Sequence, residues 1–129
     1  MILIDSSLWI EALIDPRRVP EVSSRTGEFV TCGPVLQEVL QGLDPNKPAS
    51  GVFSDYFLAL PRISDPVPSG LFLKAAEIYV HGRRRGISIR SGADCLIAAI
   101  AIENEIELWH KDRDFVALSS YTRLREVSK

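Results

Sequence analysis

Residues 91–102 read Ser-Gly-Ala-Asp-Cys-Leu-Ile-Ala-Ala-Ile-Ala-Ile, an almost wholly apolar run with one carboxylate, Asp94, near its beginning. A helix that is apolar on nearly every face is typical of the middle of a domain, so this run predicts a central helix with an acid at the edge of the core. Ser91 stands three residues before Asp94, close to the spacing of a capping box, in which both side chains satisfy free N–H groups at a helix start. A helix cap and a functional site are therefore both open interpretations of Asp94.

Length and composition indicate a single domain over residues 1–129. A chain of this length buries roughly two thirds of its unfolded surface in one core, so it needs no disulfide or structural metal. Cys32 and Cys95 lack metal-binding spacing, and we expect buried free thiols. The N-terminus lacks a signal-peptide pattern, and no segment approaches the roughly 20 apolar residues of a membrane span. We therefore expect a cytoplasmic protein with no membrane partner; its net charge of −2 does not favour nucleic acid.

Short apolar runs alternate with helical patterns along the chain. The run 2–4 is apolar and β-branched and stops at Asp5, which predicts a buried parallel strand. Gly33-Pro34 places proline near the first position of a helix, and Gly42 closes it. We predict strands at 2–4, 28–32, 107–110 and 124–127, a further short strand at 60–63, a loop at 44–50, and helices at 6–13, 33–41, 52–60, 69–84 with Ser69 as cap, from 91, and around Phe115. The alternation predicts a three-layer α/β/α domain with a mainly parallel sheet.

Acidic residues gather where these predicted strands end. Sheets of this class bind ligands outside the carboxyl ends of their strands, where the chain passes into helices. The acids at or near such positions are Asp5, Glu38, Asp94, Asp112 and Asp114. Two carboxylates about 4 Å apart repel by roughly 4 kcal/mol at an effective dielectric near 20, so a cluster must be protonated or hold a cation. Carboxylate oxygens suit Mg²⁺ or Mn²⁺, which indicates metal-dependent phosphodiester hydrolysis.

Each acid also has a structural interpretation that the sequence leaves open. Asp5 is placed to form an Asx turn or a cap with Ser6, and Glu38 to be an ordinary exposed helix residue. Asp112 and Asp114 are placed to cap the short helix that carries Phe115. Their joint position at strand ends favours a site over separate caps.

Four stretches resemble the motifs of PIN-domain proteins, and more narrowly of VapC-type ribonuclease toxins of prokaryotic toxin–antitoxin pairs. They are Ile-Asp-Ser-Ser-Leu-Trp-Ile at 4–10, Gly-Pro-Val-Leu-Gln-Glu-Val-Leu-Gln-Gly at 33–42, Ile-Arg-Ser-Gly-Ala-Asp-Cys-Leu-Ile-Ala at 89–98 and Leu-Trp-His-Lys-Asp-Arg-Asp-Phe at 108–115. The similarity spans the chain in the family's order, although no motif maps between 44 and 87. His110 departs from the Thr or other small polar residue of many family members.

The resemblance implies a fold, an activity and a set of site residues. It implies Asp5, Glu38, Asp94 and Asp112 as metal-binding catalytic acids, Asp114 as a fifth metal ligand, and Ser6 as a hydroxyl contact. It further implies Mg²⁺ or Mn²⁺ as cofactor, RNA as substrate, a VapB-type antitoxin as partner, and a homodimer.

Arginines 83–85 and Arg90 form a local basic strip beside the acidic helix. Basic residues at a helix end favour its dipole, and this interpretation stays open. We also predict that Arg84, Arg85 and Arg90 bind RNA phosphates, which makes binding salt-dependent.

The remaining histidines and aromatic residues are expected to be structural. His81 and His110 are not needed as catalytic bases, because a metal-centred mechanism requires no imidazole. Trp9 and Trp109 are expected in the core, although Leu8 and Trp9 are also candidates for an apolar groove for a dimer or antitoxin.

The leading hypothesis is a metal-dependent endoribonuclease that acts as a toxin and is neutralised by its antitoxin. One alternative is a phosphohydrolase with Asp5 as nucleophile; Ser7 argues against it, because such enzymes carry a second acid at that position. The other alternative is a non-catalytic α/β binding module whose acids are caps and solvated surface.

Overall fold

The computed structural model describes residues 1–14 and 26–127. Its sheet has the strand order β2-β1-β3-β4, and every neighbouring pair is parallel. The strands are β1 (Ile2–Ile4), β2 (Phe29–Val30), β3 (Glu107–Trp109) and β4 (Arg125–Glu126). The predicted α/β class with a parallel sheet is therefore confirmed.

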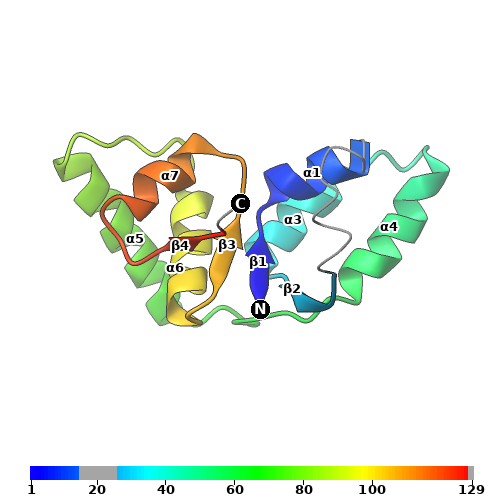
Figure 1. The fold of residues 1–129 in the computed structure, drawn as a ribbon, viewed down its shortest axis with the longest axis horizontal. Coiled ribbons are helices and arrows are strands. Elements are labelled where there is room, and N and C mark those ends of the chain that lie inside the picture. The colour runs from blue at the N-terminus through cyan, green and yellow to red at the C-terminus, as the bar shows by residue number, and fades with distance from the viewer. Residues whose placement is uncertain (15–25, 128–129) are drawn as a thin grey trace.

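Helices connect the strands, as parallel pairing requires. They are α1 (Ser6–Ile14), the 3₁₀ turn η2 (Thr26–Glu28), α3 (Gly33–Gln41), α4 (Pro48–Leu58), α5 (Ser69–Arg84), α6 (Gly92–Glu103) and α7 (Arg113–Ser119). Figure 1 shows the two central strands between two groups of helices, α1, α3 and α4 on one side and α5, α6 and α7 on the other. This arrangement matches the predicted three layers.

The carboxyl ends of the two central strands lie side by side. Ile4 pairs with Trp109 in the register of β1 and β3, and the N–H of Asp5 donates to the Trp109 carbonyl at 2.9 Å. Helix α6 leads into β3 through a short turn and runs back along it, so α6 begins where β3 ends (Figure 1). The ends of β1 and β3 and the start of α6 therefore share one edge of the sheet.

The core is built around α6, as its apolar sequence predicts. Ile97, Ala98 and Ile100 are fully buried, and α5 packs along α6. On the other side Trp9 packs edge-on against Phe29 and Phe57, and Leu8 is fully buried. Leu8 and Trp9 are thus core residues, and the suggestion that they line a surface groove is wrong.

Both cysteines and both tryptophans are buried, as predicted. Burial raises the pKa of each cysteine thiol to about 11, so Cys32 and Cys95 stay protonated and unreactive. None of the helices in the described residues is long and apolar enough to cross a membrane.

Several element boundaries differ from the prediction. Helix α4 begins at Pro48 rather than at 52, because proline fits the first turn of a helix, so the predicted loop ends earlier. The helix ends at Leu58 rather than at 60. Pro68, not Ser69, is the N-cap of α5. The predicted strand at 60–63 is a single parallel bridge between Thr31 and Arg62, and β2 is shorter than 28–32 because η2 occupies Glu28. The sequence also predicts that Asp15 and Pro16 end the first helix and that segment 17–27 is polar, with a short helix as one interpretation. Residues 15–25 lie outside the described part of the chain, so these predictions are not tested.

Candidate active site

Five acidic side chains converge on the edge where β1 and β3 end. Asp5 follows β1, Glu38 lies on α3, Asp94 in the first turn of α6, and Asp112 and Asp114 at the start of α7. Carboxylate oxygens of Asp94, Asp112 and Asp114 lie within 4.8 Å of one another. The charges of Asp5, Glu38, Asp112 and Asp114 all act on Asp94. The structure therefore places Asp94, Asp112 and Asp114 within reach of one another, with Asp5 and Glu38 near enough for their charges to act on Asp94.

Asp5 is held through one oxygen and leaves the other without a partner. The backbone N–H of Ser7 donates to Asp5 Oδ2 at 3.2 Å, and the Ser7 hydroxyl donates to the same oxygen at 2.6 Å. This is the Asx turn that the sequence left open. Asp5 is 2% exposed, and its Oδ1 is buried with no hydrogen-bond partner among the described residues. The Asx turn accounts for the hydrogen bonds of Asp5 Oδ2 and does not account for the burial of Oδ1.

Glu38 shows the same division between its two oxygens. The Ser6 hydroxyl donates to Glu38 Oε2 at 3.0 Å, while Oε1 is buried and has no partner in the described part of the chain. Burial raises the pKa of Glu38 above its ordinary value; the Ser6 bond lowers it, and the charges of Asp5 and Asp112 raise it further. Glu38 is therefore not the ordinary exposed helix residue of the structural interpretation.

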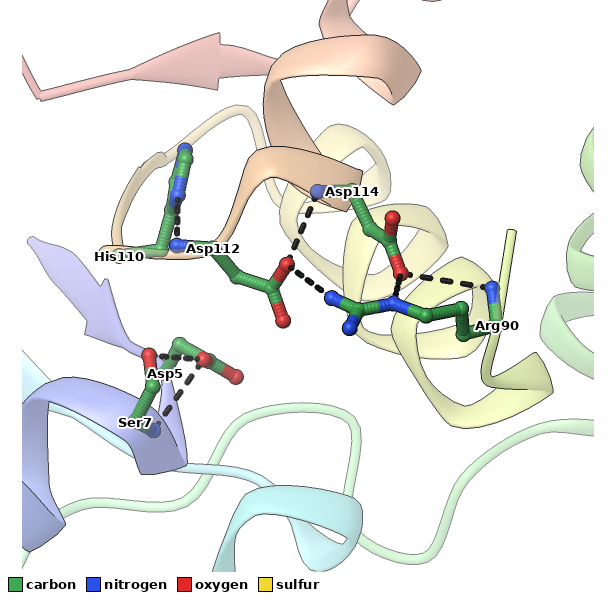
Figure 2. A network of polar contacts seen from close by, with 6 residues as sticks. All are labelled: Asp5, Ser7, Arg90, His110, Asp112 and Asp114. Carbon is green, nitrogen blue, oxygen red and sulfur yellow. Dashed lines mark hydrogen bonds and ion pairs between the residues drawn. The ribbon is translucent and has the colours of Figure 1, made fainter. Parts of the chain in front are cut away.

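Asp112 and Asp114 are linked to each other and to Arg90 (Figure 2). Asp112 Oδ1 caps α7 by accepting from the N–H of Asp114 at 2.9 Å, and it also accepts from the Arg90 guanidinium at 3.2 Å. Asp114 Oδ2 accepts from Arg90 Nε at 3.1 Å and from the Arg90 backbone N–H at 3.3 Å. The second oxygen of each acid takes part in none of these bonds.

His110 supports the segment that carries Asp112. Its Nδ1 accepts from the backbone N–H of Asp112 at 3.1 Å, so Nε2 carries the proton and donates to Glu126 Oε2 at 2.7 Å. The imidazole thus ties the end of β3 to β4 and fixes the backbone of Asp112. This is the structural role predicted for His110.

Burial and the charges of the neighbouring acids both oppose the ionisation of Asp94. Asp94 is 8% exposed, and its pKa is raised to about 7, first by burial and then by the charges of Asp5, Asp112, Glu38 and Asp114. The hydroxyl of Ser91 caps α6 by accepting from the N–H of Ala93 at 3.2 Å. Ser91 therefore caps the helix alone, and no hydrogen bond holds Asp94 among the residues described.

The oxygens left without partners fit a hard divalent cation. Buried carboxylate oxygens without partners are costly, because desolvation is not compensated. Asp5 Oδ1 and Glu38 Oε1 are two such atoms, and both belong to acids that raise the pKa of Asp94. An all-oxygen set of this kind suits Mg²⁺ or Mn²⁺, whereas zinc prefers histidine or cysteine.

Comparison with known proteins agrees with this geometry. The profile of the PIN domain family matches residues 2–120. Ribonuclease VapC11 of Mycobacterium tuberculosis and VapC ribonuclease Mb1587 of Mycobacterium bovis are each 34% identical to this chain over 137 aligned positions, which cover 99% of the chain and 98% of each relative. The chain belongs to the VapC family of PIN domains.

Solved structures share the fold of this PIN domain at low sequence identity. VapBC-1 from nontypeable Haemophilus influenzae matches with a TM-score of 0.75 at 14% identity, over 99% of this chain and 98% of that one. FitAcB from Neisseria gonorrhoeae matches with a TM-score of 0.70 at 20% identity, over 99% and 97% of the two chains.

The predicted basic strip of this PIN domain lies in three different environments. Arg83 lies over the ring of Tyr79 at 5.7 Å from the ring centre, and Arg85 lies over Tyr121 at 5.9 Å. Arg84 lines a shallow surface pocket along α5. Arg90 contacts the acids themselves. The predicted contacts of Arg84, Arg85 and Arg90 with RNA stay predictions.

Two contacts of the site were not predicted from the sequence of this PIN domain. Ser7 binds Asp5, and its position two residues after an aspartate is the local signal that finds it. Arg90 binds Asp112 and Asp114 from 22 and 24 residues away, so no local pattern reveals that contact.

Proposed function

We propose that this protein is a metal-dependent endoribonuclease that hydrolyses RNA phosphodiester bonds. The observation that carries the proposal is that Asp5, Glu38, Asp112 and Asp114 each bind the protein through one oxygen, while the other oxygen has no hydrogen-bond partner in the described part of the chain. Two of these second oxygens, on Asp5 and Glu38, are buried. Helix capping accounts for only the bonded oxygens. The names of the VapC relatives, which are ribonucleases, support the same activity.

Asp5, Glu38, Asp94 and Asp112 are the proposed catalytic acids, and with Asp114 they would hold Mg²⁺ or Mn²⁺. Such a cation supplies Lewis acidity to the phosphodiester and makes a bound water a better nucleophile at neutral pH. The side chains of Ser6 and Ser7 keep Glu38 and Asp5 in fixed orientations. The apolar body of α6 keeps Asp94 at a fixed position against the other acids.

A groove beside Glu38 offers RNA a path to these acids. Its volume is about 660 Å³, and it runs between α3 and the starts of α5 and α6. Gln37 and Gln41 give it amide groups on one wall, while Phe72 and Leu96 give it apolar surface on the other. Unpaired RNA bases are recognised by stacking on aromatic side chains and by hydrogen bonds to their edges.

The same family membership supports a role as the toxin of a toxin–antitoxin pair. A VapB-type antitoxin is the proposed protein partner, in line with the similarity to VapBC-1 and FitAcB. We further propose a homodimer of single-domain chains, each of residues 1–129, acting in the cytoplasm.

Incubation of the purified protein with RNA tests this function. Cleavage should require Mg²⁺ or Mn²⁺, stop in chelator, and fall by several orders of magnitude in Asp94→Asn. Glu103→Gln, which changes an exposed acid to an amide at the other end of α6, is the matched control and should cleave normally. Cleavage that continues in chelator, or that survives Asp94→Asn, would refute the metal-centred mechanism.

A further inference from the structure

Arg90 makes the most extensive side-chain contact with the acidic cluster from outside it. It lies just before α6, in the segment between Gly86 and the Ser91 cap, and its side chain is 61% exposed. Three of its donors are used on the cluster: the backbone N–H and Nε on Asp114 Oδ2, and one terminal nitrogen on Asp112 Oδ1. Figure 2 shows the guanidinium bridging the two carboxyl groups at the rim of the site.

The choice of oxygens is selective. The Arg90 terminal nitrogen binds Asp112 Oδ1, which also accepts from the N–H of Asp114. The other two Arg90 donors bind the same oxygen, Asp114 Oδ2. Asp112 Oδ2 and Asp114 Oδ1 receive no hydrogen bond in the described part of the chain. Ser7 and Ser6 divide the oxygens of Asp5 and Glu38 in the same way. Arg90 thus binds one oxygen each of Asp112 and Asp114, as Ser7 binds one oxygen of Asp5 and Ser6 binds one of Glu38.

We propose that Arg90 is a positioning residue, whose planar fork orients Asp112 and Asp114 so that their free oxygens face the divalent cation. This inference rests on the proposed metal-dependent function and assigns Arg90 a part in metal affinity. It differs from the phosphate contact that the sequence predicts for Arg90, because the guanidinium acts through two carboxylates and not on RNA.

A positive charge beside a cation site also repels the cation, so the two effects of Arg90 oppose each other. The repulsion is weakened because the guanidinium is largely exposed to water and salt. The orientation of two carboxylates is not screened in this way, and partners that orient metal ligands typically contribute about 10- to 100-fold in affinity. The orienting effect therefore outweighs the repulsion.

Mn²⁺ titration of the metal-free, full-length protein, followed by calorimetry without RNA, tests this role. Arg90→Gln removes both the charge and the fork, whereas Arg90→Lys keeps the charge and loses the fork. Both variants should bind Mn²⁺ about 10-fold or more weakly than the original protein. Arg62→Gln is the matched control, because Arg62 also pairs with an aspartate, Asp65, and with a backbone carbonyl, away from the acids. Its Mn²⁺ affinity should be unchanged.

The outcomes separate this role from the function on which it rests. Mn²⁺ binding by the original protein with unchanged affinity in both Arg90 variants would overturn the positioning role alone. Tighter binding in Arg90→Gln, with normal binding in Arg90→Lys, would show that only the charge acts and would overturn it too. No Mn²⁺ binding by the original protein would overturn the metal-dependent function together with it. Circular dichroism of each metal-free variant confirms that the fold is kept.

Discussion

At the scale of single residues, Asp5 and Asp112 show that capping and site formation are not alternatives here, whereas Asp94 takes no part in capping. The cap of α6 is supplied by the Ser91 hydroxyl, which leaves the Asp94 carboxyl free of any helix bond. Asp5 and Asp112 do serve local turns or caps, each through one oxygen. The structural interpretation was therefore correct for one oxygen of Asp5 and one of Asp112 only, and the oxygens that it does not explain define the site.

The raised pKa of Asp94 predicts that the metal-free protein loses stability as pH rises. The carboxyl keeps its proton up to about pH 7 when folded, against an ordinary value of 3.8, so between these values the unfolded chain gives up the proton first. Folding is then progressively disfavoured from about pH 4 to about pH 7. Asp94→Asn, which mimics the protonated form, should be more stable than the original protein at pH 8 and should lose less stability across this range.

Urea unfolding in chelator at pH 5 and pH 8 measures this effect. Glu103→Gln on the same helix serves as the control and should keep the pH dependence of the original protein. An equal loss of stability in Asp94→Asn would show that Asp94 does not titrate as described.

At the scale of elements, α5 packs along α6 and is joined to the α7–β4 turn through Tyr121. The Tyr121 hydroxyl donates to the Ile78 carbonyl at 2.9 Å and lies over Gly82. A Cβ on Gly82 would fall 2.4 Å from that hydroxyl and 2.9 Å from the ring carbon that bears it. A Cβ on Gly70, at the start of the same helix, would meet no atom within 4 Å.

The two glycines predict opposite effects of alanine. Gly82→Ala should destabilise the protein by about 1–3 kcal/mol through overpacking against Tyr121. Gly70→Ala should be neutral or stabilise by up to about 1 kcal/mol, because alanine favours the helix and nothing opposes its methyl group. Thermal unfolding of both variants measures the difference; equal effects would show that the contact with Tyr121 yields at no cost.

The sequence predicted the elements better than their boundaries or their contacts. Apolar runs and glycine or proline signals located β1, α3, α5 and α6, because these depend on neighbouring residues. The start of α4 was missed because Pro48 reads equally well as a loop residue and as a first helical residue. The contact of Arg90 with Asp114 was missed because it joins residues that only the folded chain brings together.

At the scale of the whole molecule, the acids of the site come from segments spread over most of the chain. Asp5 follows β1, Glu38 lies on α3, Asp94 on α6 and Asp112 precedes α7. A cation bound by these acids would therefore join elements from both helix groups of Figure 1. Its removal should loosen the whole sheet edge and not one loop.

Metal binding should accordingly raise global stability. At a Mn²⁺ concentration 100 times the dissociation constant, the gain should be about 2.7 kcal/mol, and chelator should reverse it. Hydrogen exchange should slow together at the ends of β1 and β3 and at the start of α6. Protection confined to one of these segments would contradict a shared site.

Arg84 and Arg85 are predicted to contact RNA although the net charge of the chain is −2. If Arg84 and Arg85 contact phosphates of single-stranded RNA, each contact adds about 0.7 to the salt dependence of binding. Arg84→Gln combined with Arg85→Gln should weaken RNA binding at low salt and reduce that slope by the corresponding amount. Filter binding across salt concentrations measures this slope. Every protein compared carries Asp94→Asn to prevent cleavage, and Arg62→Gln serves as the surface control. An unchanged slope would remove both arginines from the RNA interface.

The two buried indoles give this protein a built-in optical signal. Trp9 is surrounded by aromatic rings in the core, and Trp109 ends β3 directly beside Asp5. Both ring N–H groups are buried without a partner among the described residues. Indoles in such dry surroundings emit at short wavelengths and shift to the red when water reaches them. Intrinsic fluorescence can therefore follow unfolding of every variant described above without a label.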